Sequence, residues 1–415
     1  MMNIINKTSL NIEKFNAMVG MYAEQSYPME MPKVTSYEDF ALKYLPVDKL
    51  GLMSISDKLV LADKLTSCYV ISTSGTTSRP LVLVSRIFRD VTENSYPYQV
   101  RGFMAEHVFC ENDTVVNLLT AGCLGYNYEG MCRLLEPIGA TVLPVGRPDV
   151  MNNMPHLLRT MARFKANVLV GSPTGIIQIA QAAESLSIDL LITKIVFVGE
   201  AFHPSKREFI QRLWPRAEFY SLYGATEFGF AAVNTPSMMA HNHLILSNWF
   251  FIEQASSGEL LVTDLKSPVV PIIRYRIGDI GEIIQEDCDK FYLKVGSRAA
   301  EEFSLGGHRI SLKLVEQALI ASGVSIETYQ VKLSIVEGGK DCLTIILDME
   351  DSKINRAFTM NLERCLLSIS RLREAVIRGV SVIEWRGREQ FIYSPRGKLN
   401  RLLDSRNSAL EGQEF

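Results

Sequence analysis

The middle of the chain alternates short apolar runs with longer amphipathic stretches, and this alternation is what most constrains the fold. Four runs have the length and β-branched content of buried strands: residues 115–120, 141–146, 168–171 and 195–199. Four stretches have helical periodicity, with starting residues such as Pro155 and Ser205: residues 129–138, 152–164, 174–186 and 204–213. Strands and helices in this order predict an α/β domain with a parallel sheet and right-handed crossovers.

The sequence on either side of this region has a different character. Residues 1–65 carry helical and loop patterns, in which 43–59 look like a connector into the first strand. After Glu227, two runs alternate like half-buried strands, at residues 258–265 and 272–284. From about residue 297 the pattern predicts a short helix, a hairpin and one long amphipathic helix, over 311–320, 328–337 with 342–350, and 354–372.

The length of the chain argues for more than one domain. One hydrophobic core rarely serves as many as 415 residues. We therefore predict a large N-terminal domain over 1–297, made of parallel-sheet α/β layers and a β-rich subdomain. A small α+β domain is predicted over 298–415.

The balance of charges excludes some classes of function. The chain has 46 acidic and 43 basic residues and a net charge of −3, so no overall field favours nucleic acid or an anionic membrane. Its start lacks the features of a secretory signal, and no apolar run reaches the roughly 18 residues that would cross a bilayer. Its seven cysteines are scattered without a C-x-x-C pair, which favours reduced, mostly buried thiols in a cytoplasmic protein.

The sharpest local motif is a loop rich in hydroxyl groups that follows the apolar run 68–71. It reads Ser72-Thr73-Ser74-Gly75-Thr76-Thr77-Ser78-Arg79-Pro80. Its N–H and O–H donors could wrap phosphate oxygens, with Arg79 supplying positive charge. It is not a Walker A loop, because no Gly-Lys-Ser/Thr follows at the required spacing. A solvated Ser/Thr turn is the alternative interpretation.

A second motif, Tyr220–Gly229, places an aromatic residue before a tight turn. Tyr223 could lie flat against a purine, Thr226 could bond a phosphate, and Glu227 could hold Mg²⁺, which prefers carboxylate oxygens. An ordinary turn with a surface glutamate would look the same.

In each of two more motifs, one charged residue on a turn-like segment is a candidate ligand-binding group. In Arg274–Gly281, Asp279 sits between two glycines at the end of a strand and suits both hydroxyls of a ribose. In Ser394–Arg401, Lys398 follows a glycine and could reach a distant site, where it would pair with a carboxylate and a phosphate together. A plain turn and a basic tail are the corresponding alternatives.

Together and in this order, the four motifs resemble the core motifs of the adenylate-forming superfamily: acyl-CoA synthetases, peptide-synthetase adenylation domains and luciferases. The compact length and the stretches 122–146 and 258–281 look most like the phenylacetate–CoA ligase branch. The resemblance covers the chain from about residue 45 to 403. It implies that ATP and Mg²⁺ are bound, and that the small C-terminal domain is mobile.

The resemblance assigns roles to individual positions. The phosphate loop would be formed by Thr73, Ser74, Gly75, Thr76, Thr77 and Arg79. Adenine would be contacted by Gly199, Glu200, Ala201, Tyr223 and Gly224. The remaining nucleotide and catalytic roles would fall to Thr226 and Glu227 (phosphate and Mg²⁺), Asp279 (ribose), Arg298 (before the hinge) and Lys398 (first half-reaction). The acid would meet Gly125 and Ala201, with an aromatic gate made by Tyr126 and Tyr128.

Several positions depart from the family pattern. Arg79 replaces a lysine and keeps its charge, while Ser221 stands where Asn or Asp commonly meets the adenine amine. Ala300 stands at the hinge, where the family has aspartate or sometimes lysine. Some members of the branch hold a structural zinc after the second motif. This chain offers only His241 and His243 there. The two histidines could bind a metal, but a purely structural role is the alternative.

The sequence thus predicts a cytoplasmic, biosynthetic ligase that turns a small carboxylic acid, planar aromatic or medium-sized, into an acyl-adenylate and releases pyrophosphate. The acyl group would pass to the thiol of CoA or of a phosphopantetheine carrier protein, after a rotation that withdraws Lys398 and brings Gly306-Gly307 against the pantetheine arm. Three alternatives stay open: transfer to an amine or a reductase, a non-catalytic binding relative, and a kinase that releases ADP. A homodimer also stays open, and neither nucleic acid nor a membrane is expected as a partner.

Overall fold

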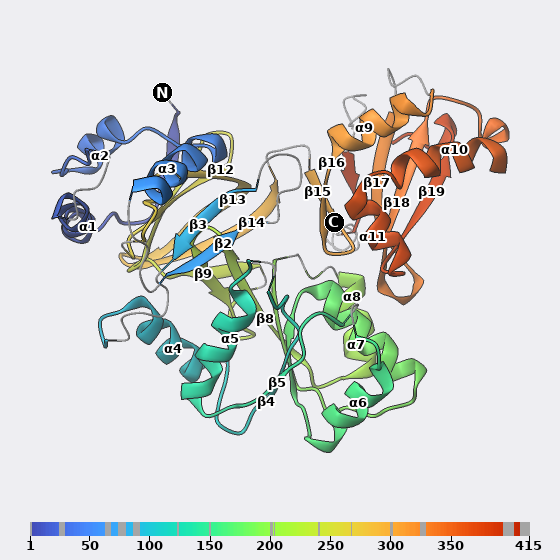
Figure 1. Ribbon diagram of the computed structural model, residues 1–415, viewed down its shortest axis with the longest axis horizontal. Coiled ribbons are helices and arrows are strands. Elements are labelled where there is room, and N and C mark those ends of the chain that lie inside the picture. The colour runs from blue at the N-terminus through green and yellow to red at the C-terminus, as the bar shows by residue number, and fades with distance from the viewer. Residues whose placement is uncertain are drawn as a thin grey trace.

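A computed structural model of the chain describes residues 2–24, 30–62, 68–73, 80–85, 92–122, 124–148, 151–199, 202, 204–239, 241–266, 268–298, 302–323, 329–392 and 402–406. The larger part is built on a twelve-stranded sheet that the first 298 residues supply, and the smaller part on a four-stranded sheet from the C-terminal residues (Figure 1). Two short two-stranded hairpins complete the described strands.

The parallel half of the large sheet has the strand order β5-β4-β6-β7-β8. Its strands are β4 (Thr114–Asn117), β5 (Thr141–Pro144), β6 (Val168–Gly171), β7 (Lys194–Val198) and β8 (Glu218–Ala225). The helices that cover it are α4 (Tyr96–His107), α5 (Asn127–Leu135), α6 (Met154–Arg163), α7 (Pro173–Ser185) and α8 (Pro204–Leu213). The predicted parallel α/β layer is therefore confirmed, with the four strands and four helices close to their expected positions.

Helices lie on both faces of this layer because successive residues of a strand point to opposite sides. Leu169 and Ile195 pack with α6, α7 and α8 on one face. Val168 and Val196 pack with α4 and α5 on the other. All four side chains are fully buried, which explains why these strands read as continuous apolar runs.

The other half of the sheet is antiparallel and continues β8 in the order β9-β10-β14-β13-β12-β11-β1. Its strands are β1 (Ile4–Lys7), β9 (Gly229–Asn234), β10 (Asn242–Ile245), β11 (Phe250–Ala255), β12 (Glu259–Asp264), β13 (Tyr275–Asp287) and β14 (Lys290–Arg298). Strands predicted over 258–265 and 272–284 are thus present as β12 and β13. The edge strand β1 is not signalled by the sequence pattern.

The N-terminal segment packs against this half with three helices and a hairpin: α1 (Ile12–Glu24), α2 (Tyr37–Lys43), α3 (Lys49–Ala62), β2 (Tyr69–Ser72) and β3 (Val82–Ser85). The expectation of a connector over 43–59 is wrong from Lys49 onward, where the chain is helical. Ser56 of α3 donates a hydrogen bond to the carbonyl oxygen of Val82 at 2.5 Å, so tertiary contact with β3 stabilises a helix whose own signals are weak.

The smaller sheet has the order β19-β18-β17-β20 and carries three helices and the β15–β16 hairpin. These elements are β15 (Glu302–Leu305), β16 (His308–Ser311), α9 (Leu312–Ala321), β17 (Tyr329–Val336), β18 (Lys340–Leu347), α10 (Arg356–Leu366), α11 (Ser370–Ile377), β19 (Ser381–Arg386) and β20 (Leu402–Asp404). The helix α9 and the β17–β18 hairpin are as predicted. A domain boundary between 297 and 298 stays a prediction, and it coincides with the end of β14.

The single helix predicted over 354–372 is wrong, because the segment forms α10 and α11. The break follows Leu366, where Ser368 donates its hydroxyl hydrogen to the carbonyl oxygen of Cys365 at 2.7 Å. A serine that bonds to nearby backbone competes with helix continuation. The apolar spacing persists through the break, so periodicity alone did not reveal it.

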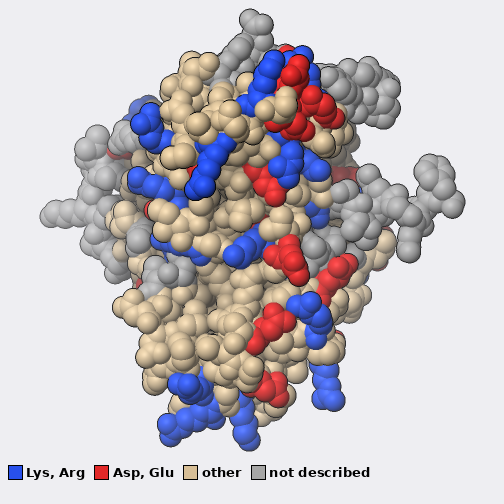
Figure 2. Space-filling model, turned by 90° about the vertical axis from the view of Figure 1, so that its right-hand side faces the viewer, with Lys and Arg blue, Asp and Glu red and all other residues tan. Residues whose placement is uncertain are grey.

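The described surface carries charges of both signs. On the face shown in Figure 2, basic and acidic side chains are interspersed. No described helix is both long enough and apolar enough to span a bilayer. No disulfide joins the six described cysteines; Cys342 is buried and Cys110 and Cys288 are exposed, so the expectation of mostly buried thiols is wrong.

Candidate active site

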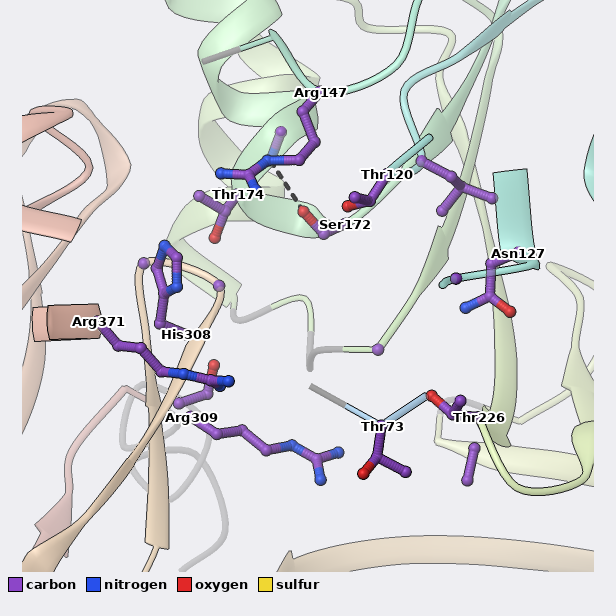
Figure 3. Close-up of a pocket in the computed structure, with 18 of the residues that line it drawn as sticks. Thr73, Thr120, Asn127, Arg147, Ser172, Thr174, Thr226, His308, Arg309 and Arg371 are labelled. Atoms are coloured by element: carbon purple, nitrogen blue, oxygen red, sulfur yellow. Dashed lines mark hydrogen bonds between the residues drawn. The ribbon is translucent and has the colours of Figure 1, made fainter. Parts of the chain in front are cut away.

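A cavity of about 960 Å³ lies between the large sheet and the β15–β16 hairpin. One wall comes from the carboxyl ends of the parallel strands and from β13, and the facing wall comes from the hairpin and α11 (Figure 3). Crevices at the carboxyl ends of parallel strands are where α/β proteins commonly bind ligands. Basic side chains outnumber acidic ones along the described lining: Lys49, Arg147, Arg276, Arg309, Arg371 and Arg378, against Glu227, Glu302 and Glu374.

The base of the hydroxyl-rich loop is held by the β2–β3 hairpin. The backbone N–H of Thr73 donates to the carbonyl oxygen of Leu81 at 2.9 Å, and the N–H of Leu81 donates to Thr73 Oγ1 at 3.1 Å. Thr73 and Pro80 both line the cavity, so the loop begins and ends at its edge. The other predicted loop residues, Ser74, Gly75, Thr76, Thr77 and Arg79, lie outside the described residues.

The second motif is a tight turn between β8 and β9. A Cβ on Gly224 would lie 2.1 Å from the carbonyl oxygen of Gly229, so only glycine permits this close crossing. Gly229 itself has a φ of +76°, the left-handed region that favours glycine. The turn places Thr226 and Glu227 at the cavity. Their roles as a phosphate contact and a Mg²⁺ ligand stay predictions.

Two tyrosine–carboxylate hydrogen bonds join the second motif to the third. The hydroxyl of Tyr223 donates to Asp279 Oδ2 at 2.9 Å, and that of Tyr275 donates to Glu227 Oε1 at 2.9 Å. Asp279 is buried, directly after Gly278, whose φ is +80°. Strand pairing therefore fixes two predicted site carboxylates relative to one another, although their motifs are about fifty residues apart. Tyr275 was not predicted as a site residue.

The arginines on either side of Tyr275 have different environments. Arg274 is buried, has a φ of +48°, and binds both oxygens of Glu253 at 2.9 Å. It also donates to the carbonyl oxygen of Tyr44 at 2.9 Å and thereby ties β13 to the segment after α2. Arg276 instead lines the cavity and pairs with Glu259 at 2.7 and 3.1 Å.

The residues predicted to contact the adenine and the acid are only partly at the cavity. Gly199, with a φ of +84° at the end of β7, and Gly125 line it. Tyr126 is 8% exposed and lies beside Gly229, and its hydroxyl has no hydrogen-bond partner among the described residues. Burial raises its pKa above the ordinary value. Tyr128 packs in the core cluster that includes residues of α4 and α5.

Neither tyrosine is among the residues that line the cavity, so their role as an acyl-pocket gate stays a prediction. Glu200, Ala201, Ala300 and Lys398 lie outside the described residues. Arg298 ends β14, and its side chain is also outside the described part.

Ser221 and the two histidines form a small polar cluster beside the second motif. His243 Nε2 is 2.8 Å from Ser221 Oγ, and its Nδ1 is 3.1 Å from the carbonyl oxygen of His241. Burial lowers the pKa of His243 to about 4, so its ring is neutral at pH 7. These bonds explain His243 as a structural histidine. Within the described ranges, no group of three or more His, Cys, Asp or Glu residues could hold a metal ion.

The facing wall contains basic residues that the sequence motifs did not identify. Gly306 and Gly307 form the turn of the β15–β16 hairpin with φ values of +54° and +81°. Arg309 and Arg371 extend from β16 and α11 into the cavity, opposite Thr73 and Thr226 (Figure 3). Arg147 lies beside Ser172 and Thr174 at the start of α7 (Figure 3). In the sequence, Arg147 directly follows Gly146 at the end of a predicted strand, and Arg309 lies two residues after Gly307.

Known proteins resemble the chain in sequence and in fold. Residues 21–246, more than half of the chain, match the family described as AMP-binding enzyme. An indoleacetate–lysine synthetase of Pseudomonas savastanoi is 25% identical over 406 residues, which cover 96% of this chain and 100% of that protein.

Among solved structures, a 2-hydroxyisobutyryl-CoA ligase with 2-HIB-AMP and CoA in the thioesterification state has a TM-score of 0.64 at 16% identity, over 96% of this chain and 91% of that chain. The same ligase in the postadenylation state with 2-HIB-AMP has a TM-score of 0.57, again at 16% identity and with the same coverage of both chains. The four motifs, the fold that joins three of them at one cavity, and the sequence match agree: the chain belongs to the AMP-binding enzyme family, within the adenylate-forming superfamily.

Proposed function

We propose that the chain converts a small organic acid, planar aromatic or medium-sized, into an acyl-adenylate and then transfers the acyl group to a thiol.

ATP supplies the AMP and pyrophosphate leaves, as in the phenylacetate–CoA ligase branch, with CoA or a phosphopantetheine carrier protein as the thiol donor. The proposal rests on one observation. Described residues of three motifs line the same cavity as the Gly306–Gly307 hairpin, which faces them.

The adenylation step is supported by the residues of the large wall. The acid carboxylate would attack the α-phosphorus of ATP, and the protein's contribution is positioning and charge neutralisation. Thr73 and Thr226 offer hydroxyl groups at the cavity. Asp279, which directly follows the lining residue Gly278, would bind the ribose hydroxyls. Lys398 would contact the acid carboxylate and the α-phosphate together.

Glu227 is the residue that would hold Mg²⁺. It is a carboxylate at the cavity whose Oε1 accepts a hydrogen bond from Tyr275, which fixes its orientation. A single carboxylate fits Mg²⁺, because this ion is usually bound by one or two carboxylates together with substrate phosphates. When bound, the ion would neutralise charge on the departing pyrophosphate.

The transfer step is supported by the arrangement of the two parts. The hairpin that would contact a pantetheine arm already faces Thr226 and Glu227 across the cavity. The TM-score is 0.64 against the CoA ligase in its thioesterification state and 0.57 against the same ligase after adenylation. Both scores refer to the same ligase with the same coverage of both chains, and the higher one belongs to its thioesterification state. This difference supports an arrangement suited to acyl transfer.

An amine acceptor is the second candidate. The indoleacetate–lysine synthetase matches this chain over nearly the full length of both proteins, and its name describes an amide rather than a thioester product. Arg309 and Arg371 on the small wall would suit an anionic acceptor of either kind, through phosphates or through a carboxylate. A carrier protein and a second copy of the chain remain further proposed partners.

The test is a product analysis with the full chain. Pyrophosphate release is measured with MgATP over aromatic, heteroaromatic and aliphatic acids, and each active acid is then offered CoA, phosphopantetheine, lysine and other amines. We expect AMP and a thioester with an aromatic acid. An amide would establish the second candidate in its place. ADP release, or no pyrophosphate exchange with any acid, would contradict the proposal.

A further inference from the structure

We infer that Lys206 and Asp341 form a latch that positions the Gly306–Gly307 hairpin for acyl transfer. Lys206 belongs to α8 of the large part and Asp341 to β18 of the small part. The inference rests on the proposed function for the meaning of the hairpin, and on contacts in the described structure for the latch itself.

The latch is an ion pair that crosses between the two parts and is shielded from water. Lys206 Nζ is 3.3 Å from Asp341 Oδ1, and the two side chains are 3% and 1% exposed. Beside it, Gln181 of α7 donates a side-chain hydrogen bond to the carbonyl oxygen of Gly338, and Gly339 lies against Ile177. The small part therefore meets α7 and α8 through the turn that joins β17 to β18.

The second oxygen of Asp341 holds the hairpin. Asp341 Oδ2 accepts a hydrogen bond from the N–H of Gly306 at 2.7 Å and is 3.5 Å from Arg406 Nη1. Arg406 in turn donates to the carbonyl oxygen of Ser304 on β15 at 2.8 Å. One carboxylate thus connects the turn that lines the cavity to the large part of the protein.

The turn also has little freedom to shift relative to Asp341. A Cβ on Gly306 would lie 2.5 Å from Ser381 Oγ and 2.7 Å from Val380 Cγ2, so the backbone of this glycine is packed against the segment that begins β19. Movement of Asp341 and movement of the hairpin are therefore coupled.

The pair stabilises one arrangement of the two parts rather than the fold of either. A buried charge needs a partner, and Asp341 has Arg406 and the Gly306 N–H within its own part. If the small part rotates away, Lys206 returns to water while Asp341 keeps these two partners. The Lys206 contact is made only in the arrangement with the hairpin at the cavity, so it shifts the population toward that arrangement.

The test measures the two half-reactions separately in Lys206→Ala. Pyrophosphate exchange should stay within about twofold of the wild-type rate. In single-turnover transfer from a preformed acyl-adenylate, the acceptor concentration for half-maximal rate should rise roughly tenfold, in the range of typical coupling between sites. The maximal rate should largely recover at saturating acceptor, because the acceptor itself favours the arrangement with the hairpin at the cavity. The acceptor is the one that the wild-type protein uses.

Three variants sharpen the result. Lys206→Arg should restore most of the wild-type behaviour. Asp341→Asn keeps an oxygen that can accept from Gly306 but removes the charge, and it should also raise the half-maximal acceptor concentration. Arg212→Ala is the matched control on the same helix, because Arg212 pairs with Glu184 at 3.0 Å within the large part and both side chains are well exposed. It should change neither step.

Hydrogen exchange supplies a readout that does not depend on activity. Lys206→Ala should speed amide exchange over residues 337–341, and Arg212→Ala should not. An unchanged acceptor dependence with unchanged exchange over 337–341 would overturn the latch. Equal loss of adenylation and transfer in a folded Lys206→Ala protein would overturn it too. If the wild-type chain forms no adenylate, the proposed function fails, and hydrogen exchange alone decides whether the latch exists.

Discussion

The two walls of the cavity are held together in different ways. On the large wall, Glu227 and Asp279 are fixed by tyrosine hydroxyls from strands of one continuous sheet. On the small wall, the Gly306–Gly307 hairpin is fixed to its own sheet and reaches the large part through the latch at Lys206. The two carboxylates assigned to the nucleotide are therefore positioned within one sheet, whereas the geometry for transfer depends on how two parts are placed. The two half-reactions should fail separately when each wall is altered.

The largest difference between the effects on the two half-reactions is expected for Lys398, whose role rests on the family resemblance. Lys398→Ala should lower pyrophosphate exchange roughly 10²–10³-fold, the loss expected when one preorganised charge contact is removed. Transfer from a preformed adenylate should change far less. Lys353→Ala, at an exposed lysine of the small part, is the control for removing a positive charge. Near-normal exchange in Lys398→Ala would refute the assigned role.

Acidification should lower the free energy of unfolding through His243 in the large part. Burial lowers the pKa of His243 from 6.5 to about 4, so between these values the unfolded chain binds more protons than the folded one. The corresponding stability is present above about pH 6.5 and is lost as the pH falls toward 4, by up to about 3 kcal/mol.

Urea unfolding of the wild type and of His243→Gln at pH 7 and pH 4.5 checks this, because carboxylates that titrate in both proteins cancel in the difference. His107→Gln, at a half-exposed histidine, should keep the wild-type pH slope. A His243→Gln protein with that same slope would contradict the prediction.

Removal of one hydroxyl should damage adenylation alone. Tyr275→Phe leaves Glu227 without a hydrogen bond that is worth roughly 1.5–3 kcal/mol when the acceptor is charged, so pyrophosphate exchange should fall about 10–100-fold. Tyr292→Phe is the matched control, since the Tyr292 hydroxyl donates to the exposed Glu286 at 3.1 Å on the same sheet. Equal activities of the two variants would mean that the orientation of Glu227 does not limit the reaction.

A methyl group in the hairpin should damage transfer alone. Gly306→Ala would place a Cβ 2.5 Å from Ser381 Oγ, and it should lower acyl transfer roughly tenfold while pyrophosphate exchange persists. Gly323→Ala is the control, because Gly323 also has a positive φ in the small part but has open space around it. The two walls would not be separable if Gly306→Ala lowered both rates together.

The sequence predicted the features that are local in the chain. Strand and helix order between residues 115 and 213 follows from periodicity, and the short motifs around Glu227 and Asp279 both contribute residues to the lining of one cavity. The features that depend on pairing between distant segments were missed. Tyr275 reaches Glu227 because β13 folds back beside β12. No sequence pattern near residue 275 predicts that contact.

The small wall was the least predictable part for the same reason. Arg309 and Arg371 come from elements about sixty residues apart, and Lys206 meets Asp341 across more than a hundred residues. The break between α10 and α11 was missed because apolar spacing continues through Ser368. The N-terminal strand β1 was missed because four residues are too few for a periodic signal.

That strand has a consequence for how the protein behaves in a crowded solution. β1 pairs with β11, a strand whose six residues are all buried, and Thr8 extends the pairing through hydrogen bonds with Ile252 at 2.9 and 3.0 Å. Without residues 4–8, β11 would become an open, apolar sheet edge, the kind of surface on which chains stack into aggregates. A segment of five residues far from the chemistry therefore serves as the sheet's protection against self-association.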